Sequence, residues 1–218
     1  MLLFVTIHLR TIRIFLIAGG FLWFALCSEG CQDNNEVKVI GCQERAFFGN
    51  PDSSLYVLPF RVGKGYYLSQ SYCNPSGGHN NQLAYDFAMV IGDTVCAARG
   101  GMVMEVKEDI EDTGYESDPS LHNHIMIRHN DGTIAFYAHL RKGSVIPVVS
   151  DKVIKGQILA ESGNSGNTGG FPHLHFGVYQ SWPTKEGFDV AVNFMNAEGD
   201  MDEKGGLIKD KFYIALPY

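Results

Sequence analysis

In its last quarter the sequence reads Pro172-His173-Leu174-His175-Phe176-Gly177-Val178. Successive side chains of a strand point to opposite faces, so this stretch predicts one apolar face and one face that carries His173 and His175 side by side. Two rigidly held imidazoles suit a metal ion, or a ligand next to a proton-transfer group. The alternative is a half-exposed strand with two solvated histidines, because short motifs often arise by chance.

A second alternating stretch, residues 83–89, supplies a carboxylate. It predicts a strand with an apolar core face and with Asp86 between two alanines on the other face. His79 precedes this strand, and His139 ends the predicted strand Thr133–His139. Taken singly, each could be an ordinary surface or buried residue. Together they offer the nitrogen and oxygen ligands that fit zinc, with the fourth tetrahedral position left for water.

These motifs resemble those of the lysostaphin-type zinc endopeptidases of bacterial cell walls. The resemblance rests on the pair His79 and Asp86, on residues 137–140 (Tyr-Ala-His-Leu) and on residues 172–176, and it covers about residues 55–195. Many members place the aspartate four residues after the first histidine, whereas the separation here is seven. A longer loop rich in Asn and Gln would absorb the added residues.

The resemblance implies a zinc ion bound by His79, Asp86 and His175, with His139 and His173 as catalytic histidines that do not bind the metal. Zinc lowers the pKa of a bound water to about 7 and polarises a substrate carbonyl. The two catalytic histidines would transfer protons or stabilise the oxyanion, and the sequence does not divide these roles between them. A covalent nucleophile is not expected, since the chain has no Gly-x-Ser-x-Gly motif and no convincing Cys–His pair.

Three further histidines flank or begin the predicted strand 124–128. His122, His124 and His129 show no partner pattern, and we expect them at the surface or at a sheet edge.

The N-terminus predicts export. Arg10 and Arg13 precede the apolar run from Ile14 to Leu26, which is short for a membrane span but suits the core of a signal peptide. We expect cleavage after Cys27, which would place the protein in the periplasm or outside the cell. A lipid-modified Cys27 and an uncleaved anchor are the alternatives, and only these would attach the chain to a membrane.

Cleavage there would leave four cysteines, enough for two disulfides with three connectivities. The preferred pairing joins Cys31 to Cys42 and Cys73 to Cys96, because each bond then closes a local loop.

The composition indicates one secreted, acidic domain. The chain has 17 basic and 24 acidic side chains, and loss of Arg10 and Arg13 with the signal peptide would leave a net charge of −9. This charge argues against nucleic acid as a partner. The expected partners are peptidoglycan stem or cross-link peptides, and we expect a monomer.

The turn and alternation pattern is β-rich throughout. It predicts strands at Leu55–Val62, Tyr66–Tyr72, Leu83–Met89, Met102–Val106, His124–Arg128, Thr133–His139, Ser144–Val149, Ile158–Ser162 and His173–Tyr179, and a last strand at Lys211–Leu216. Short strands at this spacing predict a mainly β fold, an antiparallel sandwich or partly closed barrel with the zinc site in a groove across one sheet. The expected divisions are a signal peptide (1–27), an N-terminal extension (28–54), the zinc endopeptidase domain (55–195) and a tail that packs on it (196–218).

Three functions are consistent with these features. The first is a zinc endopeptidase that hydrolyses peptide bonds in peptidoglycan. The second is a non-catalytic relative that binds wall peptides and regulates another hydrolase, although such relatives typically lack one of the five site residues. The third is a carrier domain, since residues 148–159 resemble biotinyl and lipoyl hairpins, but no lysine lies at the required turn apex.

Overall fold

The computed structural model describes residues 41–180, 182 and 187–218. Short strands dominate this part of the chain, preceded by one turn of helix, α1 (Cys42–Arg45), and a 3-10 turn at Pro51–Ser53. The strands are β1 (Gly65–Gln70), β2 (Ala84–Phe87), β3 (Thr94–Cys96), β4 (Gly101–Lys107), β5 (His124–Arg128), β6 (Ile134–Ala138), β7 (Lys152–Val153), β8 (Ile158–Glu161), β9 (Leu174–Tyr179), β10 (Ala197–Glu198) and β11 (Phe212–Ala215).

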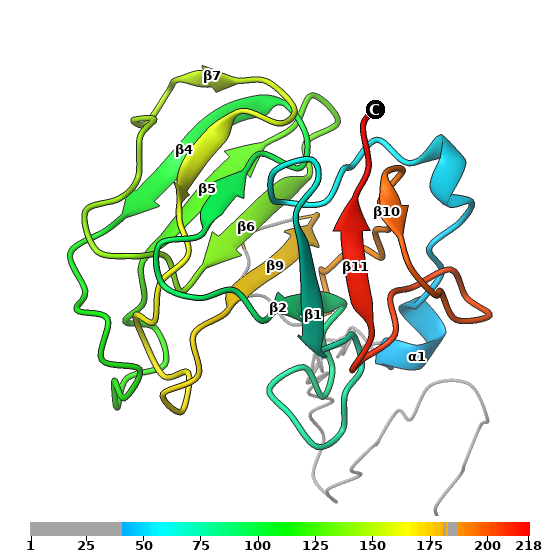
Figure 1. Cartoon of the computed structure of the whole chain (residues 1–218), viewed down its shortest axis with the longest axis horizontal. Coiled ribbons are helices and arrows are strands. Elements are labelled where there is room, and N and C mark those ends of the chain that lie inside the picture. The colour runs from blue at the N-terminus through cyan, green and yellow to red at the C-terminus, as the bar shows by residue number, and fades with distance from the viewer. Residues whose placement is uncertain (1–40, 181, 183–186) are drawn as a thin grey trace, which may run out of the picture. The chain divides into compact units, whose positions relative to one another are not determined.

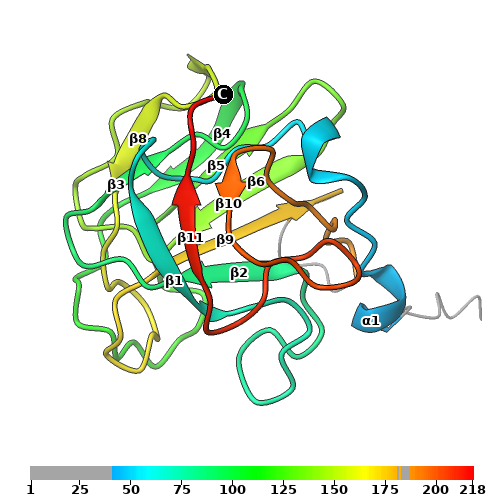
Figure 2. The same ribbon diagram turned by 45° about the vertical axis from the view of Figure 1, so that its right-hand side comes forward.

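Nine of these strands form one antiparallel sheet in the order β10-β11-β1-β2-β9-β6-β5-β4-β7 (Figure 1). Strands β3 and β8 pair with each other in a second, two-stranded sheet (Figure 2). The mainly β, antiparallel prediction is therefore confirmed. Within the described residues the large sheet ends at β10 and β7 and does not close into a barrel.

The large sheet buries side chains on both faces. One face carries the main core, which includes Tyr85, Tyr137 and Phe176. The other carries a smaller cluster centred on Met126 and Phe136. Strand alternation separates the two sets, so residues between the core positions of β2, β6 and β9 project to the second face. The predicted core face of residues 83–89 is buried as expected.

Two predicted strands are absent from the described structure. Residues 55–62 contribute one isolated bridge, from Phe60 to Val95, and residues 144–149 form no strand. Both segments contain a proline, Pro59 or Pro147, which has no backbone N–H to donate to a strand ladder. The short strands β3, β7 and β10 were not predicted, because two or three residues are too few to show alternation.

The structure describes only part of the N-terminal segments that the sequence predicts, but it describes the whole predicted C-terminal tail. The predicted signal peptide and the first part of the extension lie outside the described residues. In the described part, no helix is long and apolar enough to cross a membrane. The segment 196–218 supplies β10 and β11, and β11 pairs with β1.

The disulfide pairing predicted from the sequence is wrong. Cys73 bonds to Cys42, 31 residues earlier, and Cys96 is a buried free thiol in β3. The predicted partner Cys31 lies outside the described residues. Proximity in sequence misled the prediction, because α1 packs next to the turn that begins at Cys73, whereas β3 belongs to the second sheet. The bond links the N-terminal segment to the loop that carries His79.

We expect Cys42→Ser and Cys73→Ser to lower the free energy of unfolding by similar amounts, about 2–5 kcal/mol, because either change opens the same loop. The double variant should cost no more than either single one, as in any pair that acts as a unit. Urea unfolding of the oxidised protein measures this, with Cys96→Ala as the cysteine control. Additive losses in the double variant would show that the two residues are not bonded to each other.

Candidate metal centre

The pairing of β2 with β9 places two of the predicted ligands opposite each other. Asp86 is the direct cross-strand partner of His175. Directly paired residues of an antiparallel ladder project to the same face, so both side chains lie on the second face of the sheet. The neighbouring pair, Tyr85 and Phe176, points into the main core and is fully buried.

His79 reaches the same point from a loop. The chain turns at residues 74–82, where the Gln82 N–H donates to the His79 carbonyl at 3.2 Å. The Cys73 N–H donates in turn to the Gln82 carbonyl at 2.9 Å and closes the base of the loop. The side chain of His79 is almost completely buried, with 2% of the residue exposed. This turn absorbs the longer separation between His79 and Asp86.

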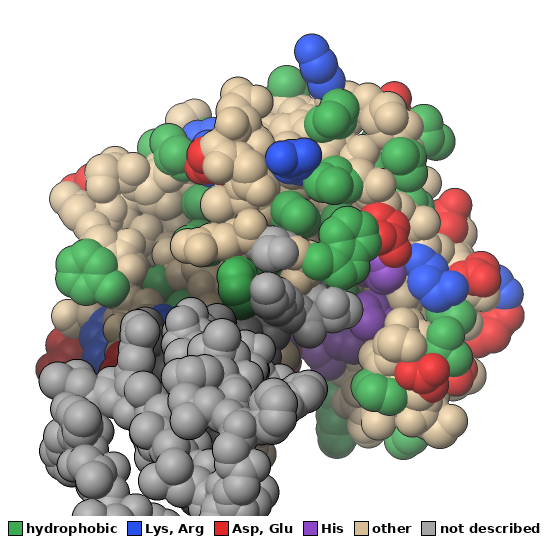
Figure 3. All heavy atoms as spheres, turned by 180° about the vertical axis from the view of Figure 1, so that it is seen from behind, with side chains coloured by type: hydrophobic (Ala, Val, Ile, Leu, Met, Phe, Trp, Pro, Cys, Tyr) green, Lys and Arg blue, Asp and Glu red, His purple; other side chains and the backbone are tan. Residues whose placement is uncertain are grey.

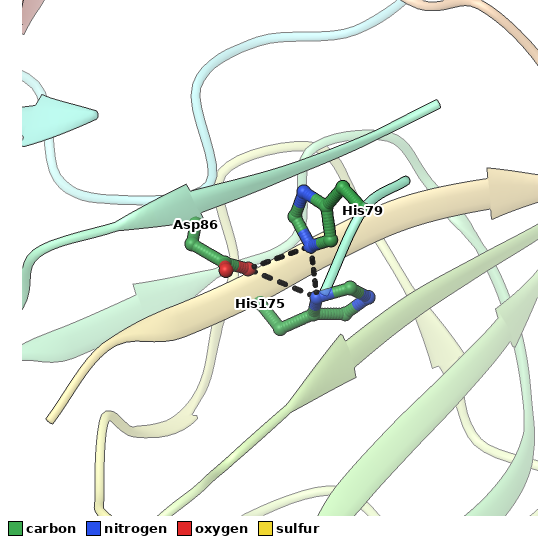
Figure 4. Close-up of side chains that lie close together, drawn as sticks. All are labelled: His79, Asp86 and His175. Atoms are coloured by element: carbon green, nitrogen blue, oxygen red, sulfur yellow. Dashed lines mark hydrogen bonds and ion pairs between the residues drawn. The ribbon is translucent and has the colours of Figure 1, made fainter. Parts of the chain in front are cut away.

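Three ligand-type atoms converge between these residues (Figure 4). His175 Nδ1 lies 2.9 Å from Asp86 Oδ1 and 3.1 Å from His79 Nε2, and His79 Nε2 lies 3.2 Å from Asp86 Oδ1. Ligand atoms at about 2.0–2.1 Å from a tetrahedral zinc are about 3.3 Å apart. The three distances are therefore close to those of a tetrahedral site.

The hydrogen bonding of His79 indicates that a cation fits. Its Nδ1 lies 3.2 Å from the Ser71 carbonyl, which can only accept, so Nδ1 carries a proton. In the neutral ring, Nε2 then directs a lone pair at the carboxylate of Asp86. This contact is repulsive unless the ring is protonated or a metal ion lies between the ligands. Fixing the outer nitrogen in this way is a common feature of metal-binding histidines.

A glutamine holds the other oxygen of the carboxylate. Gln70 Nε2 donates to Asp86 Oδ2 at 2.6 Å, and Gln70 Oε1 accepts the His79 backbone N–H at 3.4 Å. Burial opposes ionisation of Asp86, but the charge of His79 and the hydrogen bond from His175 outweigh it and hold the pKa of the carboxyl well below its usual range. Burial lowers the pKa of His175, despite its bond to Asp86.

The two predicted catalytic histidines stand next to this cluster. The rings of His139 and His173 are 4.6 Å apart, and the ring of His139 is 6.1 Å from that of His175. His139 Nδ1 donates to the Ser165 carbonyl at 2.7 Å, and His173 Nδ1 donates to the Phe171 carbonyl at 2.8 Å. Each Nε2 is therefore the nitrogen left to accept a proton in the neutral ring. Burial, with the neighbouring His173 and His175, lowers the pKa of His139 to about 3.

The backbone at His139 is held in an unusual conformation. Its φ is +61°, in the left-handed region that non-glycine residues seldom adopt. Its carbonyl accepts the Gly163 N–H at 2.9 Å, and the next residue, Leu140, donates to Asn123. Such conformations persist where the surrounding structure fixes them, often at functional sites.

The glycine-rich segment 163–171 is held in place by the buried side chain of Ser165 and the half-buried side chain of Asp112. The Ser165 hydroxyl donates to the Leu140 carbonyl at 2.8 Å and accepts the Asn123 N–H at 3.0 Å. Asp112 accepts the backbone N–H groups of Lys142 and Asn164 at 3.0 and 2.8 Å. This segment supplies both carbonyls that orient the two histidine rings.

The remaining histidines are more buried than predicted. His124 and His129 are buried, and His124 Nε2 lies 3.1 Å from Glu105 Oε1. The half-buried ring of His122 lies 5.7 Å from that of His139, and burial, with His124 adding to it, lowers the pKa of His122 to about 4. The surface or edge prediction is thus wrong for His124 and His129.

Sequence reasoning also missed the supporting residues Gln70, Ser165 and Asp112. Ser165 lies in the glycine-rich segment 163–171, shortly before His173, and this composition could have pointed to a segment that supports the site. Gln70 and Asp112 carry no comparable signal, because their partners are distant in sequence.

Seen from behind, histidine side chains reach the surface beside hydrophobic and acidic side chains (Figure 3).

The sequence profile of peptidase family M23 matches residues 80–190, about half of the chain. The chain belongs to peptidase family M23. Peptidases of family M23 are zinc-dependent. The matched range contains Asp86, His139, His173 and His175, and His79 lies one residue before it.

An uncharacterized metalloprotease of Buchnera aphidicola subsp. Baizongia pistaciae is 34% identical over 127 residues, which are 56% of this chain and 31% of the relative. The chain thus spans about a third of that protein's length. The catalytic domain of lysostaphin from Staphylococcus simulans is 27% identical, with 58% of this chain and 86% of that domain covered and a TM-score of 0.42. A zinc-containing peptidase from Vibrio cholerae is also 27% identical, with 62% of this chain and 36% of that chain covered and a TM-score of 0.38.

Substitution of a glycine beside His139 tests how tightly this part of the site is packed. Gly166 has φ +91°, and a Cβ there would lie 2.7 Å from the Cβ of His122. Gly143 has φ +65° and open space around it. Alanine at Gly143 should cost about 1–2 kcal/mol of unfolding free energy from the conformation alone. Gly166→Ala should cost clearly more, and equal losses in urea unfolding would contradict the packing argument.

Proposed function

We propose that this M23 peptidase is a zinc-dependent endopeptidase that hydrolyses peptide bonds in bacterial peptidoglycan. The observation that carries the proposal is the convergence of His79 Nε2, Asp86 Oδ1 and His175 Nδ1 within 3.2 Å of one another, beside two anchored histidines. Family membership supports the peptidase activity. The resemblance to lysostaphin-type enzymes supports the wall peptide as substrate.

In this proposal His79, Asp86 and His175 hold the zinc ion. Zinc bound there supplies a water of lowered pKa and polarises the substrate carbonyl. Gln70 orients the carboxylate of Asp86 by donating to Oδ2, and the Ser71 carbonyl orients the His79 ring by accepting from Nδ1. Each bond engages the polar atom that does not face the proposed metal position.

His139 and His173 perform the proton transfers. Each ring is fixed through Nδ1, so Nε2 is the atom that takes a proton from the attacking water or gives one to the leaving amine. Protonated, either ring also stabilises the negative charge that develops on the carbonyl oxygen. We assign these roles to the pair jointly.

The place of action follows from the substrate. Peptidoglycan lies outside the cytoplasmic membrane, and we propose that residues 1–27 direct export as a signal peptide.

Loss of one ligand should abolish zinc binding. We expect about one zinc per chain in the wild type and almost none in His79→Ala or His175→Ala. Gln70→Ala should still bind zinc, with affinity about 10- to 100-fold weaker, because the carboxylate loses its orienting partner. Metal analysis and chelator competition measure both, with His122→Ala as a nearby histidine control. A full zinc complement in His79→Ala would remove this residue from the ligand set.

Loss of a proton-transfer group should leave the metal in place. His139→Ala and His173→Ala should retain zinc but hydrolyse isolated peptidoglycan about 100- to 10,000-fold more slowly. The release of new amino groups from walls of several bacterial types measures the rate. Zinc-loaded wild type that binds wall peptides but hydrolyses none of the walls would establish the regulator instead.

A further inference from the structure

The short helix α1 contacts the loop that carries His79 near both of its ends. At the start of the loop, the disulfide joins Cys42 in α1 to Cys73. Near its other end, Arg45, the last residue of α1, donates from Nη2 to the Asn81 carbonyl at 2.9 Å and from Nη1 to Asn81 Oδ1 at 3.3 Å. α1 therefore holds this loop on either side of His79. The helix itself precedes the range that the family profile matches, which begins at residue 80.

Arg45 also forms a buried ion pair with Asp189. Its Nη2 lies 2.7 Å from Asp189 Oδ1, and the two side chains are 11% and 3% exposed. The other oxygen, Oδ2, accepts the backbone N–H of Leu83, the residue that leads into β2. Hydrogen bonds between ionised groups are stronger than those between neutral groups, and at this depth little water competes for them. One guanidinium and one carboxylate thus fix the chain between the loop and β2.

Asp189 is in turn attached to the strand that carries His175. Tyr179, the last residue of β9, pairs with Asp189 in an isolated antiparallel bridge. The ion pair therefore connects the loop of His79 to β9. This connection helps to set the separation between two of the proposed metal ligands through contacts within the protein.

We propose that Arg45 is a positioning residue for the metal ligand His79, an assignment that rests on the proposed zinc site. Asp86 and His175 lie on paired strands, whereas His79 is the one proposed ligand on a loop. Ordering a loop costs conformational entropy, so a loop that is already ordered in the metal-free protein binds the ion more tightly. Arg45 supplies this order through its contacts with Asn81 and Asp189.

Chelator competition measures the effect on zinc affinity. Arg45→Met should weaken zinc binding about tenfold or more, as is typical for residues that orient metal ligands. Arg45→Lys should restore only part of the affinity, because an ammonium group keeps the charge but not the forked set of donors. Arg99→Met is the matched control and should bind zinc like the wild type. Arg99 is also largely buried and pairs with Asp131 at 2.7 Å, in the turn between β5 and β6 that carries no site residue.

A second variant separates positioning from the effect of an unpaired charge. Loss of Arg45 alone leaves the carboxylate of Asp189 buried without its cation, which destabilises the fold. Arg45→Met/Asp189→Asn removes both charges and keeps an amide oxygen that can accept the Leu83 N–H. This variant should show the same loss of zinc affinity. In the metal-free protein its Gln82 N–H, which donates to the His79 carbonyl, should exchange with solvent faster than in the wild type or in Arg99→Met.

Wild-type zinc affinity in a folded Arg45→Met/Asp189→Asn protein would overturn the proposal, whatever the exchange rates show. His79→Ala tells this failure from a failure of the proposed zinc site. If His79→Ala loses zinc while the double variant binds it normally, only the role of Arg45 is refuted. If His79→Ala keeps its zinc, the ligand set is wrong, and the positioning role is refuted with it.

Discussion

The register of β2 against β9 is the constraint on which the candidate metal centre depends. It sets Asp86 directly opposite His175, while Tyr85 and Phe176 on the other face are locked into the main core. A slip of one residue would turn the carboxylate into the core and expose an aromatic ring. The apolar face therefore stabilises the arrangement that the polar face uses.

The other site residues are added to this pair by loops. The turn at 74–82 brings in His79, and the disulfide between Cys42 and Cys73 secures the start of that turn. The segment 163–171 fixes the two remaining rings through the carbonyls of Ser165 and Phe171. Two proposed ligands on a rigid ladder and three histidines held from their outer nitrogens give a preorganised cluster, which is what the proposed metal-assisted hydrolysis requires.

Much of the fold and of the candidate site was predictable from the sequence, because the alternation of apolar and polar residues is a local pattern. Alternation in residues 83–89 and 172–178 correctly identified which side chains share a face, and the β-rich pattern identified the fold class. The disulfide was not predictable in this way, because α1 and the turn at Cys73 meet only in the folded chain. The contact between Gln70 and Asp86 likewise joins residues far apart in sequence. The proline-containing stretches 55–62 and 144–149 looked like strands by hydrophobicity, but each contains a residue that cannot donate to a ladder.

The central claim is that a cross-strand Asp–His pair and one loop histidine form a single zinc site. X-ray absorption spectroscopy of the zinc-loaded protein tests it most directly. The account predicts four nitrogen or oxygen ligands at about 2.0–2.1 Å, with scattering from two imidazole rings and none from sulfur. A sulfur ligand, or three or more imidazoles on the metal, would contradict it.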